Sequence, residues 1–398
     1  MKNSFIIVLV ATILLAAGGI GLLAWNSAQS RTDAAVATQK AQEDYEKALQ
    51  EYEETIQQIE AQDEQNQLNY AAAKQKYDNE IAEANGGNKV WPKPASGEGW
   101  EIVDLSEFAV DQESTRTVDR QDLIYNGLLL VNQYHSRPSW YDDEKPVSVH
   151  TYNKELRVYD HSIKLLESAA AAWLELITDV STRYGWNDFM INRGYRTYAE
   201  QEKLFNEKRD KLRSKYSNDE ELLAATAKEV NLPGTSEYNT GLSLWPRLYK
   251  SGDETVNEKN NNFFESEEGI WLEENAWQYG FVFRFPLADY PVRGTQDKSY
   301  KTGISSKIRL FRYVGKANAA AMNILDMCLE EYLEYLQQHW HIAIYEDGEL
   351  RYEIFLQDVE GSLDDNETTT VRYSTKRDIT NQEAMYDNLG HIVTVMEY

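Results

Sequence analysis

Few side chains in this sequence are of the types that carry out metal or nucleophilic chemistry. The chain has six histidines and one cysteine, and no Gly-rich phosphate loop is present. His339 and His341 form an H-x-H pair, a spacing that can bind a metal ion on a strand. Their place at a predicted helix-to-strand junction favours two ordinary polar residues instead. Cys328 lies in the apolar run MNILDMCLEEYL and is expected in the core rather than as a nucleophile.

A stronger pattern comes from four separated stretches whose internal spacing is shared with one family. They are INRGYRTYAEQEKLF (191–205), PGTSEYNTGLSLW (233–245), WLEENAWQYGFVFRFP (271–286) and KTGISSKIRLFRYVG (301–315). In this order they resemble the VanY-type D-alanyl-D-alanine carboxypeptidases, zinc peptidases that trim the stem peptides of the bacterial cell wall. The resemblance extends over roughly residues 121–336, and LLLVN at 128–132 is similar to the opening strand of that family.

The same resemblance implies that the catalytic centre is changed. A zinc peptidase needs three ligands, a bound water and a carboxylate base. The His and Asp positions of the first zinc motif hold Tyr238 and Trp245, and the last His position holds Leu310. The position of the catalytic Glu holds Lys307. We therefore expect no catalytic residues, no bound metal and no cofactor.

Other positions matched by the resemblance suggest that a binding pocket is retained. Arg196 and Gln201 match residues that the family uses on substrate, and Arg193 stands where the family usually has Ser. The predicted substrate-binding side chains are Arg196, Gln201, Ser236, Lys307 and Arg309. Cationic side chains at the position where the family binds its zinc ion would attract a peptide carboxylate. The competing interpretation, which we favour for Lys307 and Arg309, is that both point to solvent and pair with surplus acids.

The elements that must position these residues indicate an α+β fold. Two stretches are typical of helices: 160–185, with Asp160 as a plausible N-cap, and 327–338. The segment 341–359 alternates around Asp347-Gly348, which predicts a hairpin. TTTVRYS (368–374) and HIVTVMEY (391–398) predict further strands, and Phe311, Tyr313 and Val314 another. We expect a degenerate VanY-like carboxypeptidase domain over 100–340 and a C-terminal β extension over 341–398.

The N-terminal hundred residues predict an anchor and a spacer. Residues 5–25 carry no charge and match the ~20 residues needed to cross a bilayer, so residues 1–27 are predicted as a transmembrane anchor, with a cleaved signal peptide as the alternative. Residues 32–85 predict a coiled-coil-like stalk whose helix of about 50 residues would be roughly 75 Å long, and a homodimer through it is possible. The Gly- and Pro-containing segment 86–99 is a predicted linker. This arrangement places the remaining chain outside the cell membrane.

The net charge of the chain limits the classes of molecule that it is expected to bind. The formal net charge of the 398-residue chain is −26, which disfavours nucleic acid and anionic lipid as partners. The resulting interpretation is a membrane-anchored, extracytoplasmic pseudopeptidase that binds peptidoglycan stem peptides or a cell-wall protein. Two alternatives remain open: an active D,D-carboxypeptidase with an unrecognised metal site, and a structural cell-surface scaffold.

Overall fold

The computed structural model describes residues 57, 61–62, 65–70, 72 and 91–398. The chain divides into two compact units, one with residues 1–65 and 197–236, the other with residues 66–196 and 237–398. The predicted anchor, most of the predicted stalk and part of the linker lie outside the described residues. Among the helices that the structure describes, none is both long and apolar enough to span a membrane.

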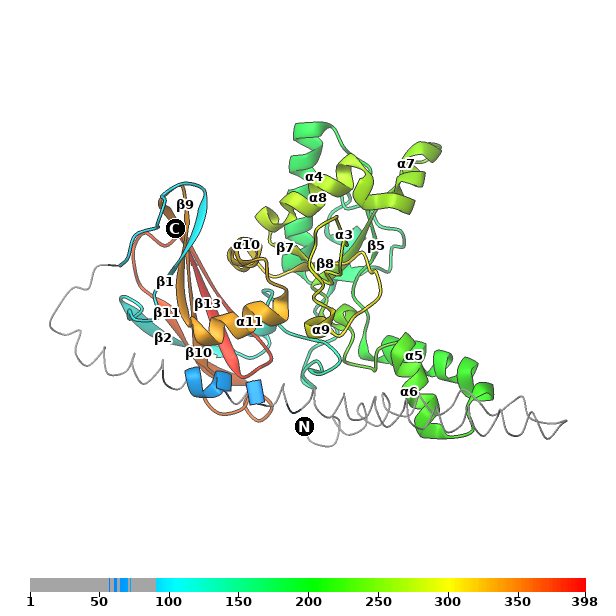
Figure 1. Cartoon of the computed structure of the whole chain (residues 1–398), viewed down its shortest axis with the longest axis horizontal. Coiled ribbons are helices and arrows are strands. Elements are labelled where there is room, and N and C mark those ends of the chain that lie inside the picture. Colours follow the sequence, from blue (N-terminus) through cyan, green and yellow to red (C-terminus); the bar gives the residue numbers. More distant parts are fainter. Residues whose placement is uncertain (1–56, 58–60, 63–64, 71, 73–90) are drawn as a thin grey trace. The chain divides into compact units, whose positions relative to one another are not determined.

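Helices and strands alternate irregularly along the described chain (Figure 1). The α-helices are α3 (Val149–Tyr152), α4 (Glu167–Tyr184), α5 (Tyr198–Leu212), α6 (Asp219–Glu229), α7 (Glu254–Glu258), α8 (Glu267–Asn275), α9 (Ser299–Thr302), α10 (Lys316–Leu325) and α11 (Leu329–Gln338). The strands are β1 (Trp100–Asp104), β2 (Glu113–Asp119), β3 (Val147–Ser148), β4 (Lys164–Leu165), β5 (Phe189–Arg193), β6 (Ser243–Leu248), β7 (Phe281–Phe283), β8 (Phe311–Tyr313), β9 (His341–Glu346), β10 (Glu349–Asp358), β11 (Thr368–Ser374), β12 (Asn381–Tyr386) and β13 (His391–Glu397). The 3₁₀ helices are η2 (Asp122–Ile124), η3 (Arg213–Lys215), η4 (Glu237–Thr240), η5 (Lys259–Glu265) and η6 (Ala276–Tyr279).

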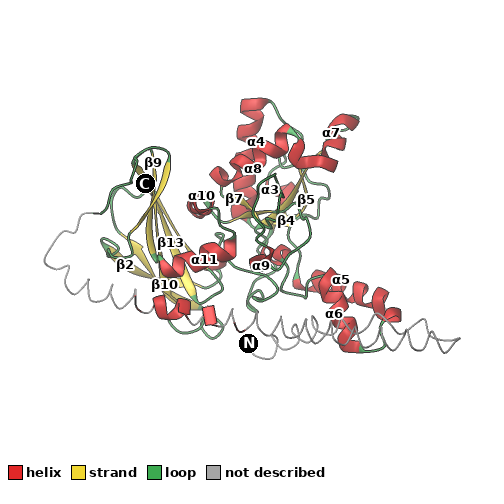
Figure 2. Ribbon diagram, in the orientation of Figure 1, coloured by secondary structure: helices red, strands yellow, loops and turns green. Residues whose placement is uncertain are grey.

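A four-stranded antiparallel sheet has the order β5-β6-β8-β7, and each of its strands contains part of one of the four motif stretches. Helices α4 and α8 lie beside it (Figure 2), and Trp173 of α4 packs edge-on against Phe189 and Phe281 of the sheet. The helix predicted over 160–185 begins later than expected, at Glu167, and Leu166 is its N-cap. Asp160 instead accepts hydrogen bonds from the backbone and hydroxyl of Ser162 in the preceding turn.

The strand predicted over 128–132 is wrong. These residues are buried but join no sheet. Their backbone groups find other partners: the carbonyl of Leu129 accepts from the Arg312 guanidinium, and the Leu130 amide donates to the carbonyl of Asp387. A buried backbone needs partners for its polar groups, and here a side chain and a loop supply them in place of a strand ladder.

A second, five-stranded antiparallel sheet has the order β1-β9-β10-β13-β12. The predicted hairpin is confirmed, with Asp347 and Gly348 both at positive φ in the two-residue turn between β9 and β10. Helix α11 packs its apolar face, including Leu333 and Leu336, onto the same core as Phe355 of β10. The strands predicted at 368–374 and 391–398 are confirmed as β11 and β13.

Two strands from the segment expected in the carboxypeptidase domain pair with C-terminal strands, one in the five-stranded sheet and one in a separate two-stranded sheet. β1 pairs with β9, and β2 pairs with β11. Strand β9 would otherwise expose its unpaired edge, and β1 covers it. The C-terminal β layer is therefore built from both ends of the described chain.

The smaller unit contains α5 and α6. Thr197 and Glu200 form a reciprocal capping box at the start of α5, and Asn218 caps α6. Leu212, Leu222 and Ala225 form its small core.

Candidate functional site

Two aromatic side chains stand where the resemblance assigns the first two zinc ligands, and an arginine lies over each of them. Tyr238 lies in η4 and Trp245 in the middle of β6. The Arg196 guanidinium carbon lies 5.0 Å from the centre of the Tyr238 ring, and that of Arg193 lies 4.9 Å from the Trp245 ring. Arg193 is also the cross-strand partner of Trp245 in the β5–β6 pair. Arg193 also acts electrostatically on the Tyr238 phenol, which links the two pairs, and the two rings with their two guanidinium groups are here called the Arg–aromatic cluster.

The backbone fixes the position of this cluster. The Arg196 amide donates to the carbonyl of Tyr238 over 3.0 Å, and the Asn239 side chain donates to the carbonyl of Arg196 over 2.7 Å. The end of the β5 segment and η4 are thereby held together independently of either side chain. A substitution of the Arg196 side chain should leave this backbone pairing in place.

The electrostatics of the cluster suit an anion better than a metal ion. Burial raises the pKa of Tyr238 to about 12, although Arg193 and Arg196 both act to lower it. The phenol is therefore protonated at neutral pH, and two positive charges act on its oxygen. A cation placed there would be repelled, whereas a carboxylate would gain charge-assisted hydrogen bonds.

The contacts given for Leu310, Lys307 and Arg309 are with residues outside the Arg–aromatic cluster. Leu310 is buried, and its carbonyl accepts from the Arg284 amide over 2.9 Å. Lys307 is exposed, with its ammonium 5.3 Å from the Tyr290 ring centre. Arg309 donates to the carbonyl of Asn260 over 2.6 Å, and burial lowers the pKa of its guanidinium to about 10.

Arg193 is the functional candidate that sequence reasoning missed. The sequence contained a signal for it, because Arg193 stands at a motif position where the family usually has Ser. The structure adds that position 193 faces Trp245 across two strands, which no spacing rule within a single motif reveals. The prediction that Lys307 and Arg309 contribute to binding stays a prediction.

The residues at the three assigned ligand positions do not fit zinc. An indole and a leucine side chain offer no metal ligand, and the Tyr238 phenol is held protonated. Within the described part of the chain, no group of three or more His, Cys, Asp or Glu side chains is placed to hold one metal ion. The H-x-H pair has other partners, since His339 contacts Asp104 over 2.8 Å and His341 contacts Glu353 over 3.0 Å.

Two predicted substrate residues, Gln201 and Ser236, belong to the smaller unit and are both buried. The Gln201 amide donates to the carbonyl of Asn231 over 2.6 Å within that unit. Their role toward a substrate stays a prediction. Cys328 is confirmed as a core residue, and burial raises the pKa of its thiol.

Comparison with known proteins identifies the family. Residues 162–316 match the VanY family, described as D-alanyl-D-alanine carboxypeptidase. The chain is 31% identical over 179 residues to VanXYC of Enterococcus gallinarum, a bifunctional D-Ala-D-Ala dipeptidase and carboxypeptidase, covering 45% of this chain and 82% of that protein. The chain belongs to the VanY family of D-alanyl-D-alanine carboxypeptidases.

Other relatives have the same described activity. The chain is 29% identical over 262 residues to a D-alanyl-D-alanine carboxypeptidase of Enterococcus faecium, covering 65% of this chain and 74% of that protein. Among solved structures, VanYB in complex with D-alanine-D-alanine is 26% identical, with a TM-score of 0.38, covering 52% of this chain and 97% of the other. The β layer formed by β9–β13 lies after the residues that match the VanY family.

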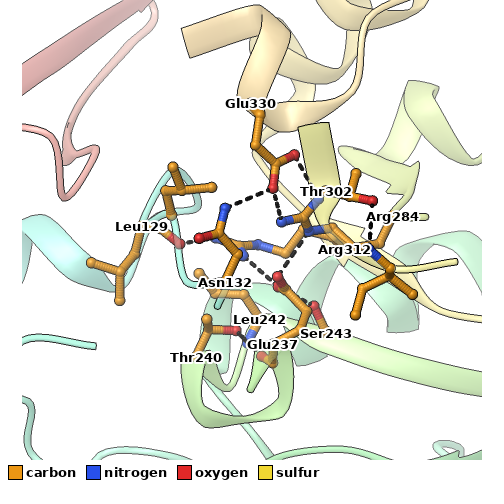
Figure 3. Close-up of polar contacts among 12 residues, drawn as sticks. Leu129, Asn132, Glu237, Thr240, Leu242, Ser243, Arg284, Thr302, Arg312 and Glu330 are labelled. Carbon is orange, nitrogen blue, oxygen red and sulfur yellow. Dashed lines mark hydrogen bonds and ion pairs between the residues drawn. The ribbon is translucent and has the colours of Figure 1, made fainter. Parts of the chain in front are cut away.

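Three residues of the VanY motif stretches and one residue of α11 build a buried charge network (Figure 3). Its members are Glu237 of η4, Arg284, Arg312 of β8 and Glu330 of α11, all almost completely buried. Arg284 donates in parallel to both Glu330 oxygens over 2.9 and 2.7 Å, and its Nε donates to Glu237 over 2.8 Å. Arg312 donates to the other Glu237 oxygen, which also accepts from Ser243.

This network balances its own charge. Burial raises the pKa of Glu237, but Arg312 and Arg284 outweigh it, so the net shift is downward. Burial likewise raises the pKa of Glu330, and Arg284 with Asn132 brings it below its usual value. Two carboxylates therefore face two guanidinium groups with no surplus charge. Because Glu237 precedes Tyr238 directly, the network also fixes the position of η4.

Proposed function

We propose that this chain is a catalytically inactive member of the VanY family that binds peptides ending in a free carboxylate without cleaving them. The Arg–aromatic cluster is the observation that carries the proposal. At the positions of two expected zinc ligands it presents two rings, and two guanidinium groups lie over them. Neither ring can activate water as a metal centre does. Three of the retained VanY motif residues, Glu237, Arg284 and Arg312, belong to the buried network, which can stabilise the fold without catalysis.

The ligand we propose is a peptidoglycan stem peptide ending in D-Ala-D-Ala, because the family is named for that substrate. Arg196 and Arg193 supply the positive charge that its terminal carboxylate requires. The aromatic rings supply an apolar surface for the alanine methyl groups. The proposal needs no metal and no general base.

We further propose that residues 5–25 anchor the chain in the cell membrane and place the VanY-like region outside it. The support is the length and the lack of charge of that segment. An extracytoplasmic location is also where a cell-wall peptide is available.

The first prediction concerns metal content and hydrolysis. The full-length chain should contain much less than one zinc per molecule by elemental analysis and should release no D-Ala from a pentapeptide stem. The physical reason is that the side chains at two of the three assigned ligand positions, Trp245 and Leu310, have no atom that can coordinate zinc. About one zinc per chain, together with D-Ala release that a chelator abolishes, would contradict the proposal and favour an active carboxypeptidase.

The second prediction concerns carboxylate recognition. Arg196→Ala should weaken binding of a D-Ala-D-Ala-ended peptide by about ten- to hundredfold, since a hydrogen bond to a charged group contributes ~1.5–3 kcal/mol. Isothermal calorimetry with free and C-terminally amidated peptides measures it. The matched control is Arg183→Ala, because Arg183 is an exposed arginine of α4 outside the cluster. Equal affinity for the free and amidated peptides would rule out recognition of the carboxylate.

A further inference from the structure

A groove unrelated to the Arg–aromatic cluster runs between the C-terminal β layer and the segments 277–278 and 313–320. One part is a cavity of about 350 Å³ with Trp100, Trp277 and Tyr352 in its walls. A second cavity, of about 210 Å³, adjoins it and includes Tyr313, Asn381 and Glu383. Lys316, Tyr352 and Glu397 line both cavities, so the two form one continuous groove.

The aromatic walls of the groove present rings in two orientations. Trp100 and Tyr352 are nearly parallel, with an interplanar angle of 17° and centroids 6.5 Å apart. Trp277 is perpendicular to Trp100 at 88° and 5.4 Å. The Trp277 indole N–H donates to the carbonyl of Glu274 over 3.0 Å, which fixes its orientation. All three rings are partly exposed, so a ligand can contact them without rearrangement of the core.

Both cations that line the groove are paired, whereas burial and the neighbouring Glu397 raise the pKa of the Glu383 carboxyl. Arg351 pairs with Glu346 over 2.7 Å, and Lys316 pairs with Glu175 over 2.7 Å. Asn381 donates to Glu383 over 3.3 Å. An anionic ligand would face Glu383 and Glu397, and the two lining cations that could compensate its lost hydration are already paired. A neutral ligand with many hydroxyl groups would find both donors and acceptors, among them Gln278, Lys316 and Glu397.

We propose that this groove binds a neutral oligosaccharide of pyranose sugars. A pyranose ring has flat faces of C–H groups that pack on aromatic rings, and an edge of hydroxyl groups that need polar partners. The groove offers both along its length. One wall comes from β1, β10, β12 and β13, which lie outside the residues matching the VanY family, and the other wall comes from η6 and the start of α10. The proposal is therefore independent of the peptide site.

In the experiment, the full-length chain is titrated with chitotetraose and with maltotetraose. Binding is measured by calorimetry and by tryptophan fluorescence. We expect one of the two to bind and to change the fluorescence. Trp277→Ala should weaken that binding by about tenfold or more, because it removes one aromatic wall. The matched control is Trp186→Ala, since Trp186 stacks on Tyr184 and lies outside the groove lining.

Two milder variants keep the test decisive if Trp277→Ala disturbs the fold. Gln278→Ala and Glu397→Gln alter only polar groups at the groove and should each weaken binding several-fold. No binding of either saccharide at 10 mM, which is about the weakest affinity that calorimetry detects, would overturn the proposal. Unchanged affinity in both polar variants, or binding of an oligolysine peptide that Trp277→Ala removes, would also overturn it.

Discussion

Replacing Arg284 by Met should lower the free energy of unfolding by about 3–5 kcal/mol, because it leaves the buried Glu330 carboxylate without its cationic partner and Glu237 with only one of its two. Arg284 is fully buried and bridges Glu237 and Glu330. Urea unfolding followed by circular dichroism measures the change. The control is Arg183→Met at an exposed ion pair, where we expect little or no change in the free energy of unfolding. A loss below about 1 kcal/mol for Arg284→Met would show that the network does not stabilise the fold.

The same network makes a pH prediction whose sign follows from its pKa shifts. The pKa values of Glu237 and Glu330 are both lowered from 4.5 in the folded chain. Their stabilising contribution is therefore complete above pH 4.5 and is lost as the pH falls below it. In Glu330→Gln this carboxylate can no longer titrate, so its stability should fall less steeply below pH 4.5 than that of the wild type. Parallel acid profiles of the two proteins would contradict this assignment.

Restoring the assigned zinc residues should produce a zinc site where the wild type has none. The variant combines Tyr238→His, Trp245→Asp, Leu310→His and Lys307→Glu, which replaces every assigned ligand and the base together. Zinc affinity should rise by several orders of magnitude, measured by competition with a chromogenic chelator. Hydrolysis of D-Ala-D-Ala need not follow, because peptidase ligands also depend on hydrogen-bond partners around them.

The structure adds a fifth change to this restoration. Arg193 lies over position 245, so in the fourfold variant a guanidinium would face the new metal site. A unit charge about 4 Å from a dication in water costs roughly 2 kcal/mol, or about thirtyfold in affinity. Adding Arg193→Ser should recover that factor, whereas Arg183→Ser should not. Equal zinc affinity with and without Arg193→Ser would mean that Arg193 does not face the site.

The sequence determined the family and part of the secondary structure. Motif spacing placed Tyr238, Trp245, Leu310 and Lys307 in register, because the flanking VanY residues occur without a gap on either side. The period of hydrophobic residues located α11, and Asp347-Gly348 located the hairpin, since positive φ at both positions is a local backbone requirement. These features depend on neighbours within a few residues along the chain.

Tertiary structure alone decided the features that depend on distant partners. The apolar run at 128–132 resembles a buried strand but joins no sheet, and the guanidinium of Arg312 donates to the carbonyls of Gly127 and Leu129 instead. The pairing of β1 with β9, and of Arg193 with Trp245, joins residues that no local pattern connects. The charge network likewise unites η4, β8 and α11, and its four buried charges are stable only because the fold brings opposite signs within hydrogen-bond distance.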